Sequence, residues 1–179
     1  MDGFIKIDKE PILIDEVDVQ KIMSEDFPAG KTNVYNPKIY SGGWGYNEEN
    51  AVIITPTEFD KSFENVMSKA VEHEYAYVPM RLYEELIINR QKGDKFSGIT
   101  WDFIEQKTVN INNHIFDVLI FNVEAFHEPA WNWLKNDYES NNYYENDEEG
   151  ERKHLETRDY MKSTFQAEFW FDITQFNIK

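Results

Sequence analysis

The residues of this chain that are most able to do chemistry are four histidines and a large excess of carboxylates. The histidines lie at four separate places: His73, His114, His127 and His154. None belongs to an H-E-x-x-H or comparable metal-binding pattern. His114 and Asp117, like Glu124 and His127, are three residues apart near the ends of predicted strands, where residues i and i+3 point to opposite faces. The spacing therefore predicts no metal site, and a site assembled from distant residues stays an alternative.

Nucleophilic catalysis has no support in the sequence motifs. The chain has no cysteine, and it contains neither a G-x-S-x-G nucleophile elbow nor an S-x-x-K motif. Paired carboxylates could serve glycoside hydrolysis, but their separation is a three-dimensional quantity that the sequence does not give. The alternative of a small hydrolase or metal-dependent enzyme therefore rests on a His/carboxylate site assembled in space, and we predict no cofactor.

A glycine-aromatic loop at 41–46 is the strongest candidate for a phosphate-binding element, but its order along the chain is wrong. A phosphate loop follows a strand and opens a helix, whereas this loop precedes the apolar strand predicted at 51–54. The loop instead presents two aromatic side chains beside two carboxylates. These four are candidate partner-binding residues: Trp44, Tyr46, Glu48 and Glu49. Burial of Trp44 in the core is the alternative.

The charge of the chain excludes several classes of partner. The 179 residues include 18 basic and 34 acidic side chains, a net charge of −16. Nucleic acids and anionic lipids need Lys and Arg for neutralisation, so we predict no direct binding to either. No apolar run approaches the roughly 20 residues that cross a bilayer. The absence of cysteine suits a reducing compartment, which favours the cytoplasm.

The acidic stretch 137–151 is the clearest candidate for a binding surface. It holds seven acidic residues and no basic one, with tyrosines interleaved. We expect an exposed loop or partly disordered excursion here. Its candidate partner-binding residues are Tyr138, Tyr143, Tyr144, Asp147, Glu148, Glu149 and Glu151.

Two helices are predicted in the first half of the chain. Thr55 suits the N-cap, Pro56 the first helical position and Glu58 a capping box, and the apolar spacing from Phe59 through Phe63 and Met67 predicts a face packed in the core. A second helix is predicted over 80–91, after a brief extended piece at 76–78 that precedes Pro79. Two short apolar runs nearer the N-terminus, at 4–7 and 12–14, predict strands.

The second half of the chain predicts a sheet. Alternating apolar residues over 96–111, an Asn112–Asn113 turn and an apolar run over 115–123 predict a hairpin whose second strand is central. Helices are predicted at 130–134 and 152–162, and a half-buried strand at 164–173. We therefore predict a single α+β domain over 1–179, with a mostly antiparallel sheet and two or three helices packed on it.

These observations favour a binding function over catalysis. An acidic surface with interleaved tyrosines would meet Lys and Arg on a basic protein and speed its capture. In size, charge and compartment the chain is similar to bacterial toxin immunity proteins, although it shares no motif with them. We expect an inhibitor that occludes a basic partner, such as a nuclease toxin. The remaining alternatives are a nucleic-acid mimic and a regulatory peptide-binding module.

Overall fold

The computed structural model describes residues 39–177, in which five strands form one sheet. The strands are β1 (Tyr40–Gly42), β2 (Val52–Ile54), β3 (Phe96–Ile111), β4 (His114–His127) and β5 (Lys162–Asp172). Their order across the sheet is β1-β2-β5-β4-β3, and each neighbouring pair is antiparallel except β2 and β5. The strands predicted at 4–7 and 12–14 lie outside the described range.

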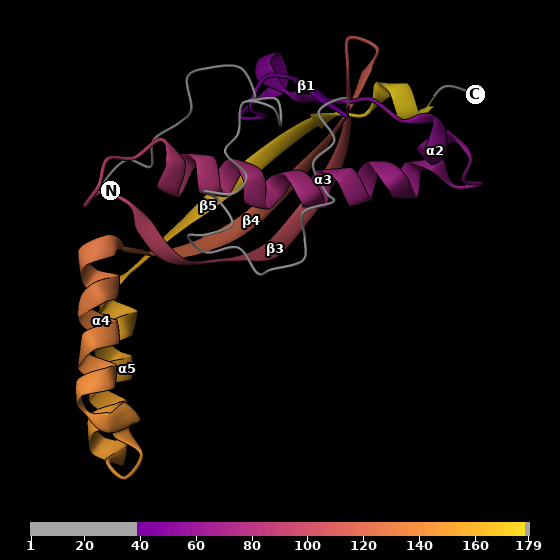
Figure 1. Ribbon diagram of the computed structural model, residues 1–179. Helices are drawn as coiled ribbons and strands as arrows, with labels where there is room; N and C mark the ends of the chain where they lie inside the picture. The colour runs from indigo at the N-terminus through magenta and orange to yellow at the C-terminus, as the bar shows by residue number, and fades with distance from the viewer. Residues whose placement is uncertain (1–38, 178–179) are drawn as a thin grey trace.

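Helices account for most of the remaining described residues. The α-helices are α2 (Glu58–Lys61), α3 (Val66–Tyr83), α4 (Glu128–Ser140) and α5 (Glu148–Met161). Shorter helical turns are the 3-10 turns Glu48–Asn50, Asn142–Tyr144 and Thr174–Asn177 and the π-helical turn Glu84–Ile88. In Figure 1, α3 lies across one face of the sheet, whereas α4 and α5 project from the end of β4 and β5. The predicted α+β class and mostly antiparallel sheet are confirmed.

The hairpin between β3 and β4 forms where the sequence predicts it. Asn112 and Asn113 have φ angles of 49° and 67°, a left-handed conformation that asparagine tolerates better than most residues. β4 then runs between β3 and β5, and every residue of 116–121 except Ile120 is buried. The prediction of a central strand is therefore confirmed.

The core lies between α3 and the facing side of β4 and β5. Alternate residues of β5 point into it, as predicted: Ala167, Phe169 and Phe171. From α3, the Tyr77 ring meets the Phe171 ring edge-on with centroids 5.6 Å apart. Each large side chain buried in this way contributes about 1.5–3 kcal/mol.

The helix predicted to begin at Thr55 begins two residues later and is short. Thr57 is the N-cap of α2, and Asp60 at N3 completes its capping box. The chain turns out of the helix after Lys61 and re-enters helical structure at Val66. Because of this break, Phe59 is 68% exposed and does not line the core. Phe63 and Met67 are also exposed. The predicted core face was therefore wrong for Phe59, Phe63 and Met67, whereas Val66 packs against the core and Ala70 is buried in it, as predicted.

Helix α3 continues through Pro79, where the sequence predicts an extended break. Proline in a helix interior costs about 3 kcal/mol. The turns around it bury Tyr77, Val78 and Leu82 completely, and at about 1.5–3 kcal/mol for each side chain this burial outweighs the cost. Packing against the sheet thus outweighs the helix-breaking tendency of Pro79, and the prediction of an extended segment here was wrong.

A fully buried arginine joins three separate segments. The Arg81 guanidinium on α3 donates hydrogen bonds to the backbone carbonyls of Trp44 (3.2 Å), Gly45 (2.8 Å) and Glu168 (2.5 Å). Its Cζ atom also lies over the Phe169 ring, 3.5 Å from the ring centroid. Burying a charge is costly unless it is hydrogen-bonded, so these carbonyls hold the glycine-aromatic loop and β5 onto α3.

A second buried ionisable group, Glu74 on α3, faces Asp117 on β4. Burial, together with the charge of Asp117, raises the pKa of Glu74 from 4.5 to about 8. Glu74 is therefore protonated at neutral pH. Asp117 also accepts hydrogen bonds from Gln106 Nε2 (2.7 Å) and Thr108 Oγ1 (2.5 Å) on β3. Side chains of α3, of β4 and of the edge strand β3 thus form one polar cluster.

The contacts of Arg81 predict that its substitution lowers the stability of the protein strongly. Arg81→Met keeps most of the side-chain volume but removes three hydrogen bonds to backbone carbonyls and the ion pair with Glu85 (3.9 Å), so it should lower the free energy of unfolding by about 3–5 kcal/mol. Urea denaturation measures this. Arg152→Met, which removes a half-exposed guanidinium from α5, should lower the free energy of unfolding far less, because exposed ion pairs contribute little to stability. Equal losses in the two variants would refute the role given to Arg81.

The raised pKa of Glu74 predicts a fall in stability as pH rises. Between about pH 4.5 and 8 the folded state keeps a proton that the unfolded state has lost, so each pH unit should cost up to about 1.4 kcal/mol. Glu74→Gln should reduce this fall and stabilise the protein at pH 8, as urea denaturation across the range would show. Glu64→Gln, at an exposed position, should leave the fall unchanged. A Glu74→Gln profile with the wild-type slope would contradict the assignment.

Candidate functional site

The candidate site is a two-helix arm, residues 128–161, inserted between β4 and β5. Phe126 of β4 pairs with Lys162 of β5, so α4 leaves the sheet and α5 returns to it side by side. Figure 1 shows the two helices projecting together, well clear of the sheet and of α3. The arm is therefore held at its base and accessible around its far end.

Trp131 fixes the base of the arm to β4 and β3. The Trp131 ring on α4 packs against the Phe126 ring, with centroids 5.3 Å apart. Gly98 on β3 faces the same indole, and a Cβ at Gly98 would lie 2.6 Å from it. Gly98 also has a φ of +59°, which favours glycine. The Glu128 side chain accepts a hydrogen bond from the Gly93 amide (2.9 Å), which anchors the first turn of α4.

The acidic stretch 137–151 is helical over most of its length, so the expected loop is corrected. It consists of the last turn of α4, the 3-10 turn Asn142–Tyr144 and the first turn of α5. Asp147 caps α5 by accepting a hydrogen bond from the Gly150 amide (2.9 Å). Glu148, Glu149 and Glu151 occupy the first turn of α5, where the helix dipole favours negative charge. The carboxylates that led us to expect a loop are therefore also typical of the first turn of a helix.

A partly buried clamp joins the two helices near the tip. Asp137 Oδ2 on α4 lies 2.7 Å from His154 Nδ1 on α5 and accepts a hydrogen bond from the Tyr144 hydroxyl (2.8 Å). His154 is only 8% exposed, and the Tyr138 ring packs on it. The hydrogen bonds from His154 and Tyr144 hold the pKa of Asp137 below its usual value. His154 thus has a structural partner that sequence spacing could not indicate.

The turn at the tip has an unusual backbone. Asn142, Tyr143 and Tyr144 have φ angles of 50°, 57° and 56°, in the left-handed region that costs a non-glycine residue about 1–2 kcal/mol. Bonds around the turn hold it, including that from Asn141 Nδ2 to the Asp137 carbonyl (2.8 Å). The turn leaves Tyr143 54% exposed. Strained backbone of this kind is concentrated at functional sites.

The carboxylates of the tip divide into two groups. Asp137 belongs to the clamp, Asp147 caps α5, and Glu149 pairs with Arg152 at 2.7 Å. The second group is exposed and makes no ion pair with the part of the chain that the structure describes: Glu139, Glu145, Glu148 and Glu151. The negative charge open to a partner therefore comes from this second group, and two of the predicted contact residues, Asp147 and Glu149, have structural roles.

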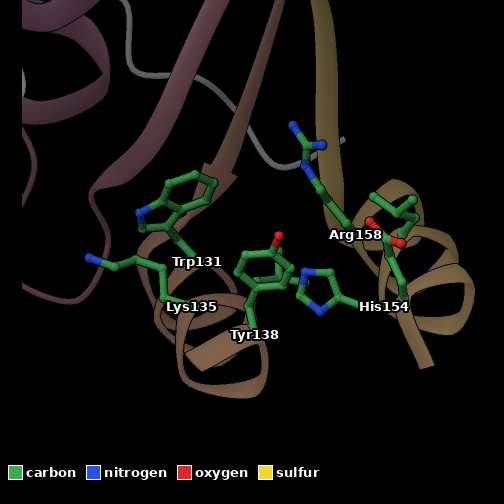
Figure 2. A pocket seen from close by; sticks show the side chains of 8 residues that line it. Trp131, Lys135, Tyr138, His154 and Arg158 are labelled. Carbon is green, nitrogen blue, oxygen red and sulfur yellow. The ribbon is translucent and has the colours of Figure 1, made fainter. Parts of the chain in front are cut away.

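A hollow of about 260 Å³ lies along the arm between its two helices. Figure 2 shows side chains from both helices facing it. Its lining is mostly apolar and aromatic, with two cations at its rim: Trp131, Leu134, Lys135, Tyr138, Glu151, His154, Leu155 and Arg158. Among the predicted residues, Tyr138 and Glu151 lie at this hollow.

The glycine-aromatic loop is not part of the same surface. Trp44 is only 2% exposed and lies in the core, and Tyr46 packs beneath Arg81. The prediction that Trp44 contacts a partner is therefore corrected. Hydrogen bonds from Arg81 to the carbonyls of Trp44 and Gly45 hold the loop against the core. Glu48 and Glu49 are exposed in the 3-10 turn that follows the loop. In Figure 1 the segment around β1 lies at the opposite end of the sheet from the arm.

Each histidine pairs with an aspartate, but the pairs are scattered over the fold. The nearest atoms are 3.3 Å apart for His73 and Asp60, 2.7 Å for His114 and Asp172, and 3.8 Å for His127 and Asp94; His154 belongs to the clamp. Within residues 39–177, no group of three or more side chains is placed to hold a metal ion. The alternative of a spatially assembled metal site gains no observation in its favour.

Comparisons with protein families, with curated proteins and with solved structures find no match to this chain. Its site is therefore interpreted from its own residues. None of the helices between residues 39 and 177 combines the length and apolarity that crossing a membrane requires.

The clamp predicts how the arm responds to acid. Because the pKa of Asp137 is lowered in the fold, its contribution is present above the unfolded value of about 3.9 and is lost as pH falls through the folded value. Protection of the α4 and α5 amides from hydrogen exchange, measured relative to the intrinsic exchange rate at the same pH, should therefore fall below about pH 4. Asp137→Asn should speed exchange already at neutral pH and weaken the acid response. Asp159→Asn, at an exposed site on α5, should resemble wild type. Unaltered protection of the arm in Asp137→Asn would refute the clamp.

Proposed function

We propose that the protein is a binding module that captures a basic partner protein through the arm. The observation that carries this proposal is the placement of the unpaired tip carboxylates on an ordered helical projection. A projecting arm can enter a concave surface that the body of a protein cannot reach. The acidic surface favours a partner rich in Lys and Arg over nucleic acid or anionic lipid.

The charge of the arm supports capture by electrostatic steering. Residues 128–161 carry ten acidic and four basic side chains, and unlike charges can raise association rates from about 10⁵–10⁶ to as much as about 10⁸–10⁹ M⁻¹s⁻¹ at low salt. Since the helices and the clamp order the tip before binding, little conformational entropy is lost on association. The exposed rings of Tyr138 and Tyr143 add contact area at low entropic cost.

A partner with a basic cleft is the class of target that this surface fits best. A nuclease toxin has such a cleft, because it must bind phosphates. Occlusion of the cleft by the arm would make this protein an immunity-type inhibitor. The proposed setting is the cytoplasm, in line with the cysteine-free composition.

The proposal is tested by reversing charge at the tip while Asp137, Asp147 and Glu149, which have structural roles, stay unchanged. Glu139→Lys with Glu145→Lys alters exposed positions, and Lys at 139 suits the C-terminal turn of α4. This double variant should bind a polylysine peptide of about 20 residues at least tenfold more weakly than wild type at low salt. Isothermal titration calorimetry measures the dissociation constant, and circular dichroism checks the fold.

The matched control is Glu64→Lys with Asp102→Lys, which makes the same change in net charge at exposed positions outside the arm. It should weaken binding much less, since screening limits the effect of distant charges. Equal weakening in the two double variants would show that net charge alone governs binding, and the arm would lose its assigned role.

A further inference from the structure

The hollow on the arm shows that its helices leave an apolar face uncovered. Two packed helices bury one side of each, and here Leu134 and His154 fill the contact between them. Leu155 remains 46% exposed and Tyr138 37% exposed, and both line the hollow. Exposed apolar side chains that gather around a concavity mark a binding site more often than scattered ones do.

The shape of the hollow suits a side chain of another helix. Its volume of about 260 Å³ is at the low end for a small-molecule pocket. The hollow lies between two helices, so a third helix laid along it would complete a three-helix bundle with its apolar stripe inward. Helix-in-groove recognition of this kind uses anchors at i, i+3 or i+4, and i+7.

Charge varies along the hollow from one end to the other. Toward the tip it is bounded by Glu151, next to the exposed carboxylates. Toward the base it is bounded by Trp131 and Arg158, with Lys135 at the rim. An occupant would therefore place its basic residues toward the tip and its apolar residues in the middle.

We infer that the hollow is the anchor site of the interface and that its occupant is a basic amphipathic helix of the partner protein. This inference rests on the proposed function and adds the structural class of the bound segment. A second copy of this chain fits less well, because its arm carries the same excess of acidic residues and its net charge is −16. The carboxylates control the rate of association, whereas the apolar anchor controls the rate of dissociation.

The probe for this inference is a peptide of about 18 residues built from leucine and lysine, with leucine at helical spacing. A matched peptide keeps the lysines and replaces each leucine with serine, and a third peptide replaces each lysine with glutamate. Binding of the fluorescently labelled peptides to the full chain is followed by anisotropy and stopped flow. The leucine–lysine peptide should bind at least tenfold more tightly than the serine–lysine peptide.

Substitutions at the hollow separate its contribution from that of the charge. Leu155→Gln removes an apolar wall at a partly exposed helical position, and Leu155→Trp fills the hollow with an apolar ring. Each should weaken binding of the leucine–lysine peptide about tenfold through faster dissociation, with little change in the association rate. Tyr160→Gln, on the same helix but 90% exposed and outside the hollow, should bind as wild type does. Circular dichroism confirms that each variant folds.

The possible outcomes distinguish this inference from the proposed function. If the serine–lysine peptide binds as tightly as the leucine–lysine peptide and only the tip variant weakens it, the anchor is refuted while the acidic capture surface stands. Tighter binding of the glutamate peptide would refute both. If sedimentation shows a dimer of the free chain that Leu155→Gln dissociates, the occupant is a second copy and the inference is overturned.

Discussion

The antiparallel ladder between β4 and β5 is the constraint on which the rest of the structure depends. It runs without a register shift from Phe116 opposite Asp172 to Phe126 opposite Lys162. At one end it places the start of α4 beside the end of α5, so the inserted residues must form a hairpin. Along its length it presents alternate apolar side chains to α3. The same ladder therefore supplies both the core and the direction of the arm.

Buried polar groups then fix the other elements to this ladder at a cost in stability. Arg81 holds the glycine-aromatic loop and β5, and Glu74 with Asp117 joins α3 to the central strands. An apolar core of the same volume could be as stable, because charges are expensive to bury. What these groups add is directional bonding, which fixes where each segment lies. The arm thus projects from a base whose parts cannot easily slide past one another.

The sequence correctly predicted the elements that depend on local backbone preference and burial pattern. The predictions were wrong where contacts between distant segments determine the structure. The Asn112–Asn113 turn and the buried alternation of Ala167, Phe169 and Phe171 follow from backbone preference and period-two burial, so both could be foreseen. Continuation of α3 through Pro79 depends on burial against the sheet, which no local pattern reports. The inward position of Trp44 depends on Arg81, which is far away in the sequence.

The sequence predicted that residues 137–151 are exposed, but it did not predict their structural form. Carboxylates and tyrosines between residues 137 and 151 indicated a surface, and most of these residues are exposed. The clamp between Asp137 and His154 and the hollow beside Leu155 arise from the packing of two helices, which spacing alone does not reveal. The clue that could have corrected the expected loop is Asp147 followed by Gly150, since aspartate often caps a helix and the glutamates beside it suit the first turn.

The proposal assigns the binding of a basic partner to the arm rather than to any other surface of residues 39–177. Mapping of backbone amide chemical shifts on titration with the leucine–lysine peptide tests it most directly, because every part of the fold is observed together. The perturbed amides should fall within residues 131–158 and follow the tip and the hollow. Perturbations centred on α2, on β3 or on the turn at Glu48 and Glu49, with the arm unchanged, would contradict it.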